Sequence, residues 1–153
     1  MNNGELKEFF ELIRTPAWLC FTWFGMTAGI SLLEAPVKFS APLITRPIAL
    51  DVGRVVFAAL NKAELVMLIL LLILVRTSGL ARQVWAGVAS LALIVLAQSA
   101  WLLPELASRA QLIATGTEPP ASPAHAIYAV LELAKLLILL AVGFRTMALV
   151  KQH

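Results

Sequence analysis

The stretch VVFAALNKAELVMLILLLILV, residues 55–75, gives the clearest indication of how this protein folds. It is apolar over about the 20 residues that a helix needs to cross roughly 30 Å of hydrocarbon. Yet Asn61, Lys62 and Glu64 lie close together in its first half. A span that carries both an ammonium and a carboxylate requires partners for these groups, and the rest of the chain must supply them.

The composition of the whole chain is that of a membrane protein. Of its 153 residues, 60% are hydrophobic and 14% are charged, whereas soluble domains are about half apolar and about a quarter charged. Three further apolar runs lie at 17–33, 84–103 and 126–144. Backbone inside hydrocarbon must satisfy its own hydrogen bonds, and the alternating pattern of barrel strands is absent. The sequence therefore predicts an all-α fold, an integral membrane four-helix bundle.

Proline and capping residues indicate where the helices begin. Thr15-Pro16 and Ser122-Pro123 are each typical of an N-cap followed by proline at the first helical position, where a missing N–H is harmless. Either Asp51 caps the second helix, or Thr45 does so and the helix is longer and more tilted. The expected spans within one domain, 1–153, are about 16–33, 52–75, 83–103 and 123–145.

A short amphipathic helix is predicted ahead of the first span, at about 3–14. Asn2 with Glu5 resembles a capping box. The apolar residues that follow at helical spacing are Leu6, Phe9, Phe10 and Ile13. Such a helix would lie on the membrane surface. The alternative is a frayed tail.

The first connection, EAPVKFSAPLITRPIALD at 34–51, contains three prolines. Because the residue before a proline avoids the helical region, the prolines are expected to break it into extended or turn pieces. Its apolar residues allow it to lie in the membrane interface over the helix ends. The alternative is an ordinary loop.

The distribution of lysine and arginine predicts the orientation in the membrane. With four spans, both chain ends share one side. That side carries six basic residues near the spans: Lys7, Arg14, Arg76, Arg82, Arg145 and Lys151. The other side carries three: Lys38, Arg46 and Arg109. The excess predicts a multi-pass protein of the cell inner membrane with both termini in the cytoplasm.

Under this topology, polar side chains of three helices share one layer, at about 1.5 Å rise per residue. The layer comprises Asn61, Lys62, Gln98, Glu132 and Lys135, with Glu64 slightly deeper. Lys62 is expected to pair with Glu132. Glu64 is expected to pair with Lys135, which Glu132 can also reach at i, i+3. Since a charge at the bilayer centre costs at least about 2.5–3.5 kcal/mol, these groups are predicted to face the bundle interior.

A polar funnel is expected to lead from the outer side down to this layer. Arg54, Asn61 and Glu64 fall within about 80° of one another on the second helix, with Lys62 to one side of that stripe. The residues predicted at the funnel mouth are Glu34, Lys38, Asp51 and His125. The charged layer either sets the helix packing or binds an ion, a proton, a polar small molecule or a partner's polar group.

Catalytic and metal-binding residues are not evident. His125 and His153 are the only histidines, and both lie outside the spans. A bis-histidine haem inside the bundle is therefore excluded, a zinc site lacks ligands, and the serines of the spans have no base. No basic patch with interleaved aromatic residues indicates nucleic acid. The sequence predicts no cofactor, no metal and no nucleic-acid partner, and it shows no evident catalytic machinery.

The stretches AGISLLEAPVKF, RPIALDVGRVVFAALNKAE and WLLPELASR, ahead of a final charged helix, resemble the small four-helix membrane proteins of the transmembrane protein 205 family. The matching positions are Gly29, Pro36, Phe39, Gly53, Phe57, Pro104 and Arg109. The Asn-Lys-Ala-Glu stretch has no counterpart in the family pattern. The resemblance implies the four-helix fold and no established reaction.

Three functions follow as hypotheses. The first is an accessory or assembly subunit of a membrane complex. The second is a small carrier or channel-like protein that uses the funnel, as an oligomer. The third, with the least support, is a membrane redox subunit that binds a quinone or lipid at the layer of Lys62 and Glu132. The expected partners are the lipid bilayer and either other membrane subunits or further copies of this chain.

Overall fold

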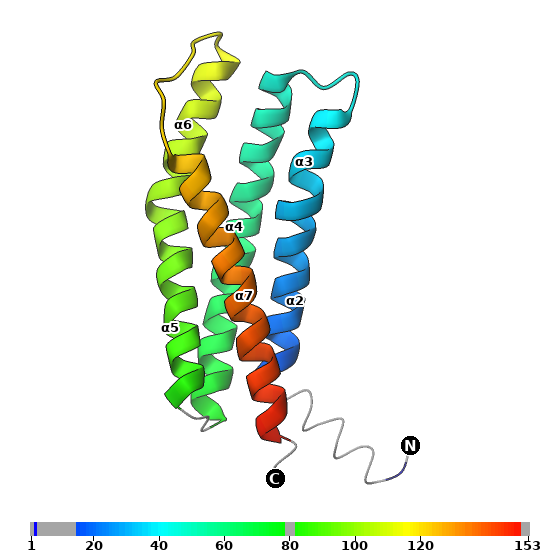
Figure 1. The fold of residues 1–153 in the computed structure, drawn as a ribbon, viewed down its shortest axis with the longest axis vertical. Helices are drawn as coiled ribbons and strands as arrows, with labels where there is room; N and C mark the ends of the chain where they lie inside the picture. Colours follow the sequence, from blue (N-terminus) through cyan, green and yellow to red (C-terminus); the bar gives the residue numbers. More distant parts are fainter. Residues whose placement is uncertain (1, 3–14, 79–81, 151–153) are drawn as a thin grey trace.

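The computed structural model describes residues 2, 15–78 and 82–150, and the regular structure within these ranges is entirely helical. The predicted surface helix at 3–14 lies outside the described residues. Four helical rods run alternately in opposite directions (Figure 1). We call the end at which α2 begins and α7 ends the terminal end, and the opposite end the loop end.

The rods are built as follows. The first comprises α2 (Pro16–Ala28), the π-helical turn η1 (Gly29–Glu34), α3 (Ala35–Val37) and the 3-10 turn η2 (Lys38–Ser40). The second is α4 (Arg46–Thr77). The third comprises α5 (Arg82–Ala97), the π-helical turn η3 (Gln98–Leu102) and α6 (Leu103–Ala114). The fourth is α7 (Ala124–Val150).

Each rod is long and apolar enough to cross a membrane. The qualifying segments are Pro16–Ser40, Arg46–Thr77, Val84–Ala114 and Ala124–Leu149, of 25, 32, 31 and 26 residues. They are longer than the predicted spans and longer than the roughly 20 residues that hydrocarbon requires, so their ends reach beyond it or the rods tilt. This is the architecture of a multi-pass membrane protein.

The helix starts follow the capping residues closely. Thr15 occupies the N-cap position of α2. Thr45 occupies that of α4, which decides between the two predicted starts of the second helix. The fourth rod begins one residue after Pro123, and the Ala124 N–H donates to Ser122 Oγ at 3.2 Å.

Each of the two π-helical turns ends just before a proline, with one residue between them. The turn η1 ends at Glu34, shortly before Pro36, and η3 ends at Leu102, shortly before Pro104. A proline lacks the backbone N–H, and its ring clashes with the carbonyl four residues earlier. A locally wider turn accommodates this clash without breaking the rod.

The prediction that prolines break the whole connection at 34–51 into extended or turn pieces is therefore wrong. The first rod continues as helix to Ser40, and α4 already begins at Arg46. Only residues 41–45 link the two rods. The π-helical turn explains why Pro36 fits inside a helix.

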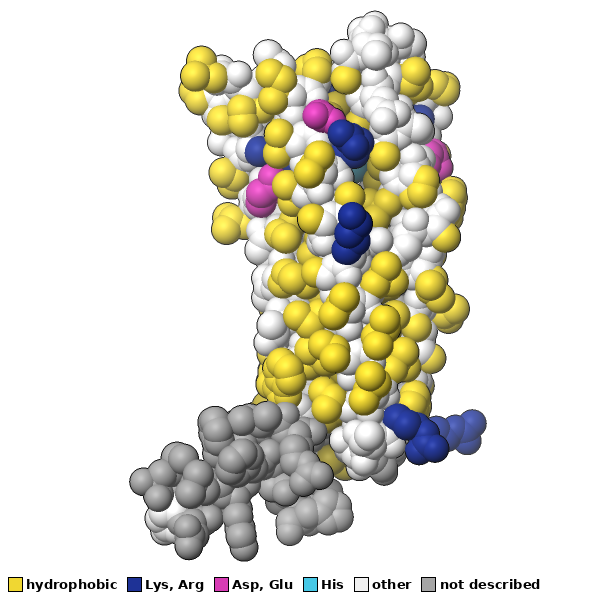
Figure 2. Space-filling view, turned by 180° about the vertical axis from the view of Figure 1, so that it is seen from behind, with side chains coloured by type: hydrophobic (Ala, Val, Ile, Leu, Met, Phe, Trp, Pro, Cys, Tyr) yellow, Lys and Arg dark blue, Asp and Glu magenta, His cyan; other side chains and the backbone are white. Residues whose placement is uncertain are grey.

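The apolar core is concentrated toward the terminal end. Its buried members include Leu19, Trp23, Leu71, Val75, Val88, Leu91 and Leu139. The loop half holds a much smaller buried cluster of Leu102, Ala124 and Tyr128. On the face seen in Figure 2, hydrophobic side chains cover much of the rods, and the acidic side chains gather toward the loop end.

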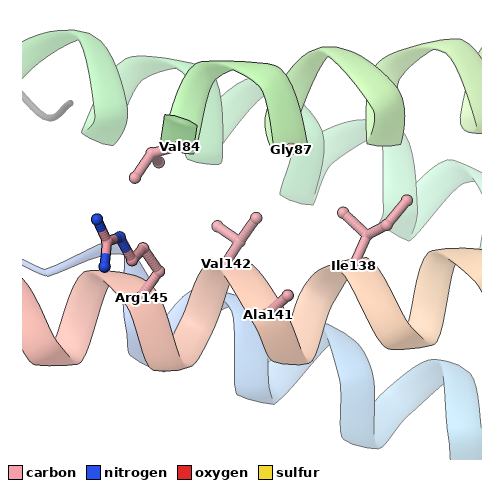
Figure 3. Close-up of a pocket in the computed structure, with 6 residues that line it drawn as sticks. All are labelled: Val84, Gly87, Ile138, Ala141, Val142 and Arg145. Atoms are coloured by element: carbon pink, nitrogen blue, oxygen red, sulfur yellow. The ribbon is translucent and has the colours of Figure 1, made fainter. Parts of the chain in front are cut away.

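A glycine allows α5 and α7 to approach closely in the terminal half. A Cβ added at Gly87 would lie 2.5 Å from Val142 Cγ2. Figure 3 shows Val142 projecting from α7 toward the helix that carries Gly87, beside a hollow that Val84, Ile138 and Arg145 also line. Packing here leaves no room for a side chain at Gly87.

Candidate functional site

Lys135 is the centre of a buried polar network. Its side chain is completely buried. Its Nζ lies 2.6 Å from Glu64 Oε1 on α4 and 2.8 Å from Glu132 Oε2 on its own helix. It also donates a hydrogen bond to Gln98 Oε1 at 2.9 Å. An ammonium has three N–H donors, so these three acceptors satisfy it.

Glu64 ties the first rod to this centre. Trp23 Nε1 and Thr27 Oγ1, both on α2, each donate to Glu64 Oε1 at 3.0 Å. All three side chains are buried. Glu64 therefore joins α2, α4 and α7 through one oxygen.

Glu132 receives its partners from the two π-helical turns. Ser31 Oγ in η1 donates to Glu132 Oε1 at 2.6 Å. Gln98 Nε2 in η3 donates to Glu132 Oε2 at 2.8 Å. Such turns occur often at functional sites, because they shift side chains out of the regular helical register. Here both deliver a polar group to the same carboxylate.

We call the following residues the buried network: Trp23, Thr27, Ser31, Glu64, Gln98, Glu132 and Lys135. It connects all four rods. Within it, two carboxylates contact one ammonium, and the described part of the chain brings no second basic side chain to them. The network therefore has more acidic than basic groups. In an apolar interior, such an excess favours an additional cationic or hydrogen-bond-donating group.

The structure contains the predicted pairing of Glu64 with Lys135 and of Glu132 with Lys135. The predicted pairing of Lys62 with Glu132 is wrong, because the Lys62 side chain is exposed. Residues two apart on a helix lie about 200° apart around its axis. When Glu64 faces the interior, Lys62 must therefore face outward.

Asn61 and Arg54 lie outside the buried network. Asn61 is half-buried, and its Nδ2 donates to Ser99 Oγ at 2.8 Å, which links α4 to η3. Arg54 lies nearer the loop end and pairs with Asp51 at 2.7 Å. The buried network therefore contains fewer residues of the second rod than the sequence predicts.

Sequence reasoning missed the contribution of the first rod. Trp23, Thr27 and Ser31 follow one another at intervals of four residues, which places them along one face of a helix. That spacing was the available signal. Their hydrogen bonds to carboxylates on other rods could not be read from it.

A cavity of about 860 Å³ occupies the loop half and reaches the buried network. Its walls are mainly apolar and come chiefly from η1, α3, η2, α4, α6 and α7. Ser31 and Glu132 line its inner part. Phe57 and Tyr128 also line it and form an edge-to-face pair with ring centroids 5.6 Å apart. The volume is in the range of small-molecule sites, about 300–1,000 Å³.

Basic side chains line the cavity toward the loop end: Lys38, Arg46, Arg54, Arg109 and His125. Most have an acidic neighbour. Lys38 Nζ lies 3.4 Å from Glu34, and an Arg46 guanidinium nitrogen lies 3.6 Å from Glu118. The Lys38 side chain is largely buried, whereas Arg46 and Glu118 are both exposed. Exposed pairs such as Arg46–Glu118 contribute little stability.

The four residues predicted at the funnel mouth relate to the cavity in two ways. Lys38 and His125 line the cavity directly. Glu34 and Asp51 contact it through the bases they pair with. Lys38 Nζ also lies 5.6 Å from the centroid of the Phe57 ring, within the range of a cation–π contact.

The cavity also opens sideways, between η1 and α7. Leu32 and Leu133 both line it and are 60% and 55% exposed. Figure 1 shows the reason: α7 crosses the bundle obliquely, close to α2 toward the terminal end and to α6 toward the loop end.

Within residues 2, 15–78 and 82–150, no group of three or more His, Cys, Asp or Glu side chains could hold a metal ion. The acidic inner end of the cavity suits a donor or cation, and its walls suit an apolar body.

A scan against protein-family models and searches of curated proteins and of solved structures find no match to this chain. The resemblance to the transmembrane protein 205 family stays a prediction. The candidate site rests on its own geometry.

Proposed function

We propose that this chain is a small binding protein of the carrier type in the membrane, which takes an amphiphilic molecule into the cavity of the loop half. The observation that carries the proposal is the double role of Glu132. Its carboxylate belongs to the buried network and also lines the cavity. A ligand can therefore contact the acidic network directly.

The chemistry of the walls defines the ligand class. Apolar side chains such as Phe39, Phe57 and Leu106 surround most of the volume. A ligand needs an apolar body to replace water there favourably. At the inner end, a protonated amine or another strong donor would complement the excess of carboxylates around Lys135. An amphiphile with an amine head group meets both requirements.

The proposed location is the cell inner membrane, with both termini in the cytoplasm. The support is the excess of lysine and arginine on the side of the termini. In this orientation the cavity opens outward and toward the outer leaflet. The ligand would then enter from the outside or from that leaflet.

The accessory-subunit hypothesis remains the second candidate. It is favoured by one specific observation, the exposed position of Lys62 on the outer face of α4. An oligomer of this chain and a quinone site remain predictions without a further supporting contact.

Binding of dodecylamine to the full chain in detergent tests the proposal, with dodecyl sulfate as the probe of opposite charge. Dodecylamine is expected to bind saturably and to raise the melting temperature. Glu132→Gln should weaken binding about tenfold, because a charge-assisted contact becomes a neutral one. Glu105→Gln is the matched control, since Glu105 belongs to the loop half but does not line the cavity.

A second variant separates ligand binding from network stability. Ala110 lines the cavity and is not a member of the buried network, so Ala110→Phe should fill the cavity and abolish binding while the chain stays folded. Equal binding of dodecylamine by wild type, Glu132→Gln and Ala110→Phe would refute the proposal. Preference for dodecyl sulfate would refute the assigned ligand class.

A further inference from the structure

Lys62 is an exposed charge in the middle of an apolar helix face. No hydrogen bond or ion pair to its ammonium is found among the described residues. Its neighbours along the face include Val66 and Ile69, both 56% exposed. In the described chain, it is the one exposed charged side chain within the middle third of a spanning segment.

The position of Lys62 along α4 leaves it far from water in a membrane. It stands near the midpoint of Arg46–Thr77, a helix of 32 residues. At 1.5 Å per residue, each end is roughly 22–24 Å away. Half the hydrocarbon thickness is about 15 Å, more than the length of a lysine side chain. Lipid alone would leave this ammonium without a counter-charge.

The surrounding face has the pattern of a helix-packing seam. Its exposed residues recur at alternating steps of three and four: Val52, Val55, Ala59, Lys62, Val66, Ile69 and Ile73. We call this set the α4 seam. Steps of three and four keep a straight stripe in contact with a second helix, and β-branched residues pack well in such stripes. A single polar residue within a stripe selects the partner and its register.

We infer that the α4 seam docks a transmembrane helix of a different membrane protein, and that this helix carries an aspartate or glutamate opposite Lys62. The argument is charge complementarity. A carboxylate on the partner would neutralise Lys62 inside the contact, where water cannot. The apolar steps on either side of Lys62 would hold the two helices together.

A second copy of this chain does not fit the seam. Apart from the buried Glu64 and Glu132, the described carboxylates lie toward the loop end: Glu34, Asp51, Glu105 and Glu118. A symmetric contact between parallel copies would place Lys62 against Lys62. Because none of the described carboxylates is placed to face Lys62 of a second copy, we assign the carboxylate to another protein.

The inference is independent of the proposed ligand. The residues of α4 that line the cavity include Gly53, Arg54 and Phe57, whereas the seam follows another face of the helix. Glu64, which anchors α4 to the buried network, faces inward. Loss of ligand binding would leave the seam unchanged.

Synthetic helices test the charge preference of the seam. The full chain is reconstituted in phosphatidylcholine vesicles with a labelled peptide of about 20 leucine, valine and alanine residues that carries one central glutamate. Energy transfer measures association. The glutamate peptide is expected to associate roughly five- to tenfold more tightly than its glutamine counterpart. Lys62→Leu should abolish the difference, and Lys62→Glu should transfer the preference to a peptide with a central lysine.

Lys62 is exposed, so these variants should keep the wild-type melting temperature, which serves as the folding control. Equal association of the glutamate and glutamine peptides with the wild type would overturn the inference. So would a glutamate preference that persists in Lys62→Leu.

Photo-crosslinking in native membranes tests the partner itself. A benzophenone side chain at Val66 lies in the seam, and one at Leu137, 59% exposed on α7, is the control. Val66 should crosslink to a spanning segment of another protein that contains an acidic residue, and Lys62→Leu should reduce the yield several-fold. A crosslink to a second copy, to lipid alone, or to a segment without an acidic residue would overturn the inference.

Discussion

The terminal and loop halves of the bundle are packed in different ways. In the terminal half, Leu71, Leu91 and Leu139 are completely buried in one continuous core. In the loop half, the buried apolar cluster is the small one around Leu102, and a cavity of about 860 Å³ separates the rods. The buried network lies where the two halves meet. The closely packed terminal half thus holds the rods together, while the loop half contains the cavity.

The difference has a local cause. Glycine at 87 lets α5 and α7 approach closely in the terminal half. The prolines at 36 and 104 follow π-helical turns in the loop half, where α7 leaves α2. The same turns deliver Ser31 and Gln98 to Glu132. The features that loosen the loop half therefore also build the inner end of the cavity.

The largest effect is expected from Lys135→Met, which removes the base at the boundary between the halves. It leaves Glu64 and Glu132 buried without their ammonium. Breaking a buried pair from one side costs about 3–5 kcal/mol. Titration with a denaturing detergent should show the free energy of unfolding falling by that order. Adding Glu64→Gln and Glu132→Gln should restore much of it; failure of this rescue would show that the loss arises from packing alone.

A medium effect is expected from Gly87→Ala in the terminal half, with Gly53→Ala in the loop half as its matched control. A Cβ at Gly87 meets a branched methyl of Val142 at 2.5 Å, whereas one at Gly53 meets the movable Lys38 Nζ at 2.8 Å. Overpacking costs roughly 1–3 kcal/mol, so Gly87→Ala should lower the melting temperature clearly and Gly53→Ala hardly at all. Equal losses would contradict the division into a tight and an open half.

The smallest effect is expected from Arg54→Gln at the loop end. Arg54 pairs with Asp51 at a distance of 2.7 Å, but both side chains are substantially exposed. Such pairs contribute about 0–1 kcal/mol. The melting temperature should therefore stay close to that of the wild type. A loss of stability comparable to that of Lys135→Met would mean that exposed ion pairs are a main source of stability in the loop half.

Part of the architecture can be read from the sequence alone: the four apolar segments and the charged residues available for buried pairs. Apolar length and the position of each charge are local properties, so four candidate spans and the charged residues available for pairing follow from them. The structure contains the predicted pair of Glu64 with Lys135 but not that of Lys62 with Glu132. Helical spacing also shows that Glu64 and Lys62 cannot face the same way. Which of the two turns inward depends on the other rods.

The rotation of each rod and the place where the rods separate depend on contacts between the helices. Trp23 and Thr27 select the inward orientation of Glu64 by donating to it from another rod. The π-helical turns shift the register of Ser31 and Gln98, and the oblique path of α7 leaves the cavity beside Glu132. These outcomes depend on contacts between residues far apart in the chain. No local pattern contains that information, because the rotation of each helix is chosen by the packing of all four.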